Sequence, residues 1–232
     1  MRRSASLERT ETTADGTWPN GIWDATLESF RESVAGAEPV PASVSVAAVS
    51  ATLGVSLLQK VLEIVAKRKS FTGDPGRLAS LRQAARDVAE RLVHYADEDI
   101  AAYRAYMEAR RRTAAASDAA EAETARALRD VVEVPIKAAR SALAGLDLCA
   151  DAAGIVRGAV AADLGTAAIL LAGPACAMVL SAEVNLGQLP DLQQAPHRPA
   201  TVECREIEER AQRQLKSILR QVAVGAGTAH NL

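Results

Sequence analysis

Two long uncharged tracts constrain the fold of this 232-residue chain more than any other feature. The first runs from Ala42 to Gln59, and the second covers the 19 residues from Leu164 to Ala182. Stretches of this length are either membrane spans or the buried helices of a bundle. The first tract is rich in Ser and Thr, and the second has flanking acids and no aromatic or basic anchors, which favours buried helices. We therefore expect a soluble protein without a membrane partner.

The remaining sequence is also helical in pattern. The most regular segment has apolar or aromatic residues at steps of three or four from Leu78 to Met107, and we expect that helix to end near Arg112. Further helices are expected at 22–35, at about 43–69, from Val131 past Ala150, over the second uncharged tract, and through Ile207 to Val222. Residues 113–125 are expected to be either a loop or a helix start capped by Ser117 or Asp118. Aromatic residues are only 3% of the chain while Ala is abundant, which suits closely packed helices. The predicted fold is all-α, an up-and-down bundle with long buried helices.

The chain is expected to form a single domain. Residues 1–21 have basic residues but no apolar segment after them, and we interpret them as a disordered arm. The helical domain is expected over residues 22–224, followed by a flexible tail at 225–232. No internal repeat or sustained heptad pattern is present.

Charge and cysteine content exclude several classes of function. The 27 basic and 29 acidic residues give a net charge of -2, which argues against a nucleic-acid partner. Cys149, Cys176 and Cys204 lie far apart in sequence, so a zinc site is not expected. An odd number of thiols without a signal peptide indicates the cytoplasm. Because no Gly-rich phosphate loop occurs, we expect no tightly bound cofactor or metal.

Asp99 is the first candidate catalytic residue. In the helix expected from Leu78 to about Arg112, Asp99 lies on the same apolar face as Leu92, Ala96 and Tyr103, which we expect to be buried in the core. A carboxylate there must be paired, hydrogen-bonded or protonated, because an unpaired buried charge costs several kcal/mol. Such carboxylates serve as general acids or bases, and structural ion pairs use them too. Both interpretations stay open for Asp99.

Asp163 is the second candidate, because it is the only charge between Arg157 and Glu183. Its simpler interpretation is a cap for the helix that follows. Asn185 closes the second uncharged tract and is interpreted as a helix cap or as a hydrogen-bonding residue of the core.

Lys60 and Glu63 lie three residues apart and are the only charged residues before Lys67 in the helix expected at about 43–69. They are expected either to pair with each other or to meet a substrate or an acid on another helix. The basic run 67–69 ends this helix, where cations suit the helix dipole. That run is also suited to an anionic substrate tail.

Five segments in order resemble the formiminotransferase-cyclodeaminase C-terminal family, which includes formiminotetrahydrofolate cyclodeaminases and methenyltetrahydrofolate cyclohydrolases. The likeness runs from about Thr26 to Asp191. Its segments are the helix entry T-L-E-S-F followed by P-V-P-A-S-V-S-V-A-A, then A-D-E-D-I-A-A-Y-R-A-Y-M, V-P-I-K, A-A-D-L-G-T-A-A and S-A-E-V-N-L. The resemblance places Asp99 and Asp163 on two aspartates of the family and Asn185 on an asparagine.

The resemblance implies a homodimeric helical enzyme that handles a one-carbon adduct of tetrahydrofolate, by ammonia loss or water addition. Either reaction needs a carboxylate near a cationic amidinium carbon, a role suited to Asp99 and Asp163. The residues expected to bind this substrate are Ser43, Ser45, Lys60, Glu63, Tyr103 and Asn185.

Departures from the family pattern cluster around the expected pocket. Ala42-Ser43-Val44 replaces a triple glycine, which compromises close backbone approach to a ligand. Val156-Arg157 stands in place of Gly-Asn, and Ser181 in place of Asn. These changes motivate two alternatives to a folate enzyme. One is a cyclase, lyase or dehydratase acting on a non-folate substrate, and the other is a non-catalytic helical interaction protein.

Overall fold

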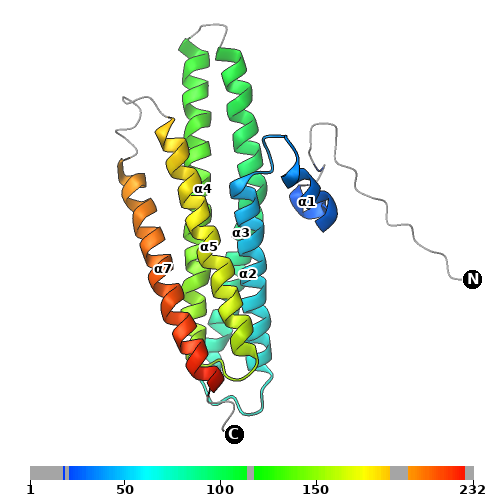
Figure 1. Cartoon of the computed structure of the whole chain (residues 1–232), viewed down its shortest axis with the longest axis vertical. Helices are drawn as coiled ribbons and strands as arrows, with labels where there is room; N and C mark the ends of the chain where they lie inside the picture. Colours follow the sequence, from blue (N-terminus) through cyan, green and yellow to red (C-terminus); the bar gives the residue numbers. More distant parts are fainter. Residues whose placement is uncertain (1–17, 19–20, 114–117, 189–197, 228–232) are drawn as a thin grey trace, which may run out of the picture.

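The computed structural model describes residues 18, 21–113, 118–188 and 198–227, and this part of the chain contains helices and no strands. The elements are η1 (Ile22–Asp24), α1 (Leu27–Ala35), α2 (Ser43–Ala66), α3 (Pro75–Thr113), α4 (Asp118–Ala153), α5 (Val160–Gly187) and α7 (Arg198–Gly227). Helices α2 to α5 form the bundle, and α7 packs against α4 and α5 (Figure 1). The predicted all-α bundle is confirmed. Most of the expected N-terminal arm and residues 228–232 of the expected tail lie outside the described residues.

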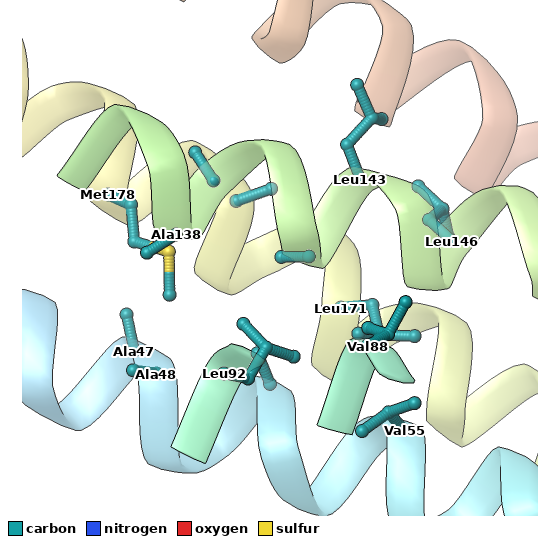
Figure 2. Packing of buried hydrophobic residues seen from close by; sticks show 14 of the residues in the cluster. Ala47, Ala48, Val55, Val88, Leu92, Ala138, Leu143, Leu146, Leu171 and Met178 are labelled. Carbon is teal, nitrogen blue, oxygen red and sulfur yellow. The ribbon is translucent and has the colours of Figure 1, made fainter. Parts of the chain in front are cut away.

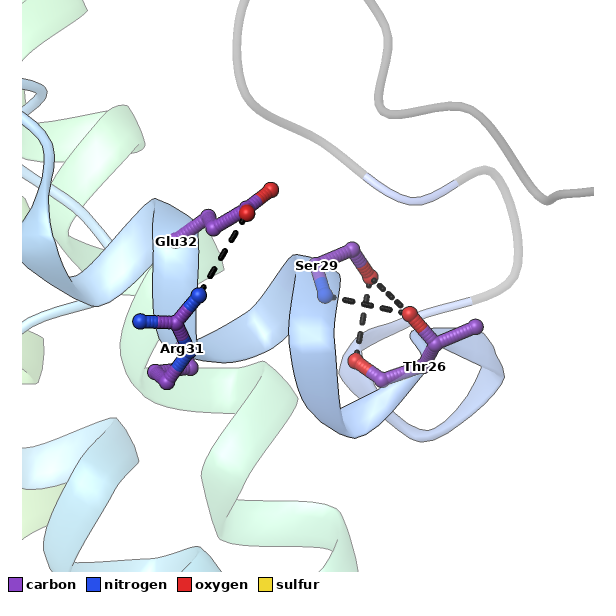
Figure 3. Close-up of polar contacts among 4 residues, drawn as sticks. All are labelled: Thr26, Ser29, Arg31 and Glu32. Carbon is purple, nitrogen blue, oxygen red and sulfur yellow. Dashed lines mark hydrogen bonds and ion pairs between the residues drawn. The ribbon is translucent and has the colours of Figure 1, made fainter.

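The prediction of one continuous helix over residues 22–35 is wrong, because the chain forms a 3-10 turn and then a separate helix, α1. Thr26 is extended and caps α1, where its side-chain oxygen accepts a hydrogen bond of 3.0 Å from the backbone N–H of Ser29 (Figure 3). Such a cap satisfies a backbone donor that a helix start leaves open. The 3-10 turn is held to α3 by Asp97, whose carboxylate accepts from the Ile22 N–H at 2.7 Å.

Helices α2 and α5 carry the two uncharged tracts and form much of the core. Leu58, Leu62 and Leu171 are fully buried, and each such side chain stabilises the fold by about 1.5–3 kcal/mol relative to exposure. Small residues of α2 and α4 lie between the larger ones (Figure 2). By length and composition both helices are apolar enough to cross a membrane, yet 56% of each apolar window is buried within the protein. This burial agrees with their prediction as core helices.

Helices α2 and α5 run antiparallel and approach closely at Gly54. A Cβ placed on Gly54 would lie 3.0 Å from Cβ of Leu170 and 3.1 Å from its carbonyl oxygen. At one end of the pair, Oγ of Ser43 lies 2.8 Å from Oγ of Ser181. At the other end, Lys60 meets Asp163. The register therefore sets the start of α2 beside the end of α5.

The other helices follow the predicted pattern with small differences. Helix α2 ends at Ala66, three residues before the expected end, and Lys67 is its C-cap. Asp74 caps α3 by accepting from the Gly76 N–H at 2.8 Å, and Pro75 starts that helix. Helix α4 continues through Pro135, which lies inside it.

Candidate active site

A cavity of about 460 Å³ opens where the start of α2, the middle of α3, α4 and the end of α5 meet. Its described lining residues are Pro39, Val40, Ala42, Ser43, Val44, Asp99, Tyr103, Val131, Leu180, Ser181, Val184 and Asn185. The lining is mostly apolar with a few polar groups, as is usual for small-molecule sites. No Lys or Arg is among these described lining residues, so Asp99 supplies the charge. We call this cavity the Asp99 pocket.

Asp99 is positioned by the buried hydroxyl of Ser45 on α2. Oγ of Ser45 donates a 2.7 Å hydrogen bond to Oδ2 of Asp99, and Ser45 itself is fully buried. Burial raises the pKa of the Asp99 carboxyl above its ordinary value, and the hydrogen bonds from Ser45 oppose that rise. A partly buried carboxyl with a raised pKa and one fixed oxygen is equipped to accept and return a proton.

Three other predicted binding residues line the same pocket. Tyr103 lies one helical turn beyond Asp99 on α3, and Ser43 pairs with Ser181 across the α2–α5 contact. Asn185 is fixed by the 3.1 Å hydrogen bond that its Nδ2 donates to the carbonyl oxygen of Val131. Its amide therefore acts as a hydrogen-bonding group that joins α5 to α4, one of the two expected roles.

Asp163 lies outside the Asp99 pocket. It is in the first turn of α5, where its Oδ2 accepts from Nζ of Lys60 at 2.9 Å and its side chain is 35% exposed. The expectation that Asp163 caps α5 is wrong, since the N-cap is Ala159 and no side chain caps that end. Lys60 is 15 residues beyond Ser45 on α2, which separates the two acids by about 22 Å along the helix.

Lys60 and Glu63 do not pair with each other. Lys60 meets the acid on α5, and Glu63 accepts from Nε of Arg82 on α3 at 2.7 Å. Of the two expected interpretations, the structure shows the one in which Lys60 meets an acid on another helix. Neither residue lines the Asp99 pocket.

Some site residues had little or no signal in the sequence. Ser181 stood out only as a replacement for a family asparagine, and its hydroxyl now contacts Ser43. Val131 and Arg82 belong to ordinary helical patterns, so nothing local predicts a role as backbone acceptor for Asn185 or partner for Glu63. These roles depend on which helices become neighbours.

The three cysteines are free, and they are poor candidates for nucleophiles. Burial raises the pKa of the Cys149 thiol to about 12 and that of Cys204 to about 11. Because the thiolate is the reactive form, these side chains are inert near neutral pH. Within the described residues, no group of three or more His, Cys, Asp or Glu could hold a metal ion.

Comparison with known proteins gives a family match and a match among solved structures. The family model described as formiminotransferase-cyclodeaminase matches residues 26–203. Among solved structures, a formiminotetrahydrofolate cyclodeaminase from Thermotoga maritima superposes with a TM-score of 0.71 at 19% sequence identity. That match covers 88% of this chain and 96% of the other, and it shows a shared fold. No curated protein matches the sequence.

Proposed function

Because the chain belongs to the formiminotransferase-cyclodeaminase family, we propose that it is a cyclodeaminase-like or cyclohydrolase-like enzyme acting on a one-carbon adduct of tetrahydrofolate. The reacting group is an amidinium carbon, which either loses ammonia during ring closure or takes up water. The neighbour from Thermotoga maritima, whose title names a formiminotetrahydrofolate cyclodeaminase, supports this substrate class.

The observation that carries the proposal is the charge of the Asp99 pocket. Asp99 lies in a mostly apolar cavity whose described lining contains no cationic side chain. A carboxylate in such surroundings attracts a cationic group strongly, because little water screens the interaction. An amidinium carbon carries that positive charge. The pocket therefore favours a cationic reacting group over an anionic one.

Asp99 is also suited to the proton transfer that ring closure requires. N10 of the folate attacks the formimino carbon, the bond from that carbon to the amino nitrogen breaks, and ammonia leaves. In the same sequence a proton passes from N10 to the leaving nitrogen. Ionised Asp99 accepts the first proton and returns it to the leaving group, while Ser45 fixes its carboxylate.

The test combines binding and turnover. Isothermal titration calorimetry with 5,10-methenyltetrahydrofolate should show binding, and the loss of its absorbance should show water addition. Asp99→Asn should lower kcat by about 10²–10⁴-fold, the usual contribution of a general base. Asp87→Asn is the matched control, because Asp87 is exposed on the same helix and accepts from Gln83. Absence of binding to any reduced folate would rule out the proposal.

A second candidate is a smaller amidine as substrate, on the same scaffold and with the same acid. Ala42 and Val44 line the pocket where the family resemblance expects glycines, and the Ser43 hydroxyl is tied to Ser181. These side chains occupy space at the start of α2 that glycines would leave open. This candidate predicts that Asp99 is essential for activity and that reduced folates do not bind.

We also propose a cytoplasmic homodimer that packs through α2 and α5. Leu53, Ile169, Leu180 and Val184 are 54%, 50%, 61% and 57% exposed on these two helices. A second copy covers such a surface through the same residues on both subunits. If α2 runs in opposite directions in the two copies, the Lys60–Asp163 pair of the partner subunit lies near the Asp99 pocket. Both candidate acids then serve one shared site.

A further inference from the structure

A second cavity, of about 380 Å³, lies at the opposite end of the bundle. It is formed by the loops that follow α2 and α4, with Val65 on its wall. Val65 and Val44 are 21 residues apart on α2, so this cavity is about 30 Å from the Asp99 pocket. Within one chain it is therefore a site separate from the Asp99 pocket.

Two arginines, Arg68 and Arg157, line this cavity without an acidic partner in the described part of the chain. Nη1 of Arg68 donates to the Arg157 carbonyl oxygen at 2.9 Å. Nη1 of Arg157 donates to the carbonyl oxygens of Ala153 at 3.2 Å and Val156 at 2.7 Å. Each guanidinium thus uses one nitrogen on backbone carbonyls, and Arg carries two further nitrogens that donate.

The acids of the flanking segments are already engaged elsewhere. Glu63 pairs with Arg82, Asp151 pairs with Arg77, and Asp163 pairs with Lys60. The fourth acid, Asp74, accepts from the Gly76 N–H at the start of α3. None of these four acids pairs with Arg68 or Arg157, so the positive charge of the two arginines is available to an external anion.

The other residues that line the cavity indicate which kind of anion it would bind. Ser70 and Thr72 line the cavity and supply hydroxyl donors, while Val65, Phe71 and Ile155 supply apolar walls. Two guanidinium forks with adjacent hydroxyls match the several oxygens of a phosphate. The cavity is also larger than an inorganic anion needs, and its apolar wall suits an organic group. We propose that it binds a small phosphorylated organic molecule, with its phosphate on Arg68 and Arg157.

Calorimetry on the full chain with phenyl phosphate tests the proposal. The wild type should bind it saturably, and Arg157→Gln should weaken binding by about tenfold or more, the effect of losing a charge-assisted pair. Gly154→Leu should also abolish binding by filling the cavity, since a Cβ on Gly154 meets no atom within 4 Å. Arg91→Gln is the matched control, because Arg91 is an exposed arginine of α3 outside the cavity.

Two further ligands distinguish the contribution of the phosphate group from that of the apolar wall. Inorganic phosphate should bind more weakly than phenyl phosphate, because it leaves the apolar wall uncovered, and benzoate should bind more weakly because it lacks the phosphate. Equal binding of benzoate and phenyl phosphate would contradict a phosphate site. Binding that is absent in the wild type, or unchanged in both Arg157→Gln and Gly154→Leu, would show that the arginines only satisfy helix carbonyls.

Discussion

Asp99 and Asp163, the two acids that the family resemblance brings forward, lie at opposite ends of the α2–α5 pair. Asp99 contacts Ser45 and Asp163 contacts Lys60, which places them about 22 Å apart along α2. One chain therefore does not combine them around a single substrate atom. In the antiparallel dimer that we propose, the partner subunit brings its own Lys60–Asp163 pair near the Asp99 pocket.

Mixing two inactive variants tests this shared site. Asp99→Asn and Asp163→Asn homodimers should each lose activity, and exchanging their subunits should restore up to about a quarter of the wild-type activity. Random exchange makes half of the dimers mixed, and each mixed dimer has one site with both acids. Activity is measured before and after mixing under conditions that allow subunit exchange. If Asp163→Asn alone retains full activity, or if mixing restores none, the site is not shared in this way.

The proposed dimer surface can be tested by placing a charged side chain on it. Leu180→Glu should convert the dimer to a monomer, because a carboxylate on a covered apolar surface loses its hydration without gaining a partner. Val202→Glu is the control, since Val202 is a comparably exposed residue of α7, at 58% against 61% for Leu180. Sedimentation velocity reports the mass of each variant. A monomeric wild type, or equal masses for both variants and the wild type, would contradict the proposed surface.

The acidic limb of the pH–activity profile should depend on Ser45. Burial raises the Asp99 pKa and the Ser45 hydrogen bonds lower it, so Ser45→Ala should raise that pKa further. If ionised Asp99 is the base, activity increases as pH rises through its pKa, and the limb moves to higher pH in the variant. The measurement is kcat/KM against pH for both proteins. A limb that stays in place would show that Asp99 does not set the profile.

Asp99 should also reduce stability at neutral pH. A carboxyl whose pKa is higher in the folded state contributes stability below its unfolded pKa, and this contribution is lost as pH rises through the folded pKa. Asp99→Asn cannot ionise and still offers Ser45 an acceptor. The variant should therefore have a higher Tm than the wild type near neutral pH, and the difference should shrink in acid. Thermal unfolding followed by circular dichroism checks both points.

The α2–α5 contact should tolerate no side chain at Gly54. Gly54→Ala places a Cβ 3.0 Å from Cβ of Leu170 and near its backbone, so overpacking should cost about 1–3 kcal/mol of unfolding free energy. Gly165→Ala on α5 meets only ordinary contacts at 3.5 Å, and the gain in helix propensity should stabilise by about 0.5–1 kcal/mol. Urea unfolding gives both values, and equal effects would contradict the close approach.

The all-helical fold could be predicted because helical periodicity is a local property of sequence. The apolar residues spaced three or four apart from Leu78 to Met107 predicted α3. The two uncharged tracts predicted α2 and α5 as core helices. Asp99 was also predictable as an unusual residue, since its position on the apolar face of α3 is fixed by spacing alone. The break at Thr26 was missed because a capping residue and an amphipathic pattern occupy the same segment.

The sequence by itself determined the helices, their apolar faces and the one carboxylate that interrupts a core stripe, because each depends on residues within a few turns of one another. Only the tertiary structure decided which charges meet. Lys60 pairs with Asp163 rather than Glu63, and Ser45 meets Asp99, because helices distant in sequence pack in one particular register. The separation of Asp99 from Asp163 follows from the same cause, since α2 and α5 run antiparallel and set the two acids at opposite ends.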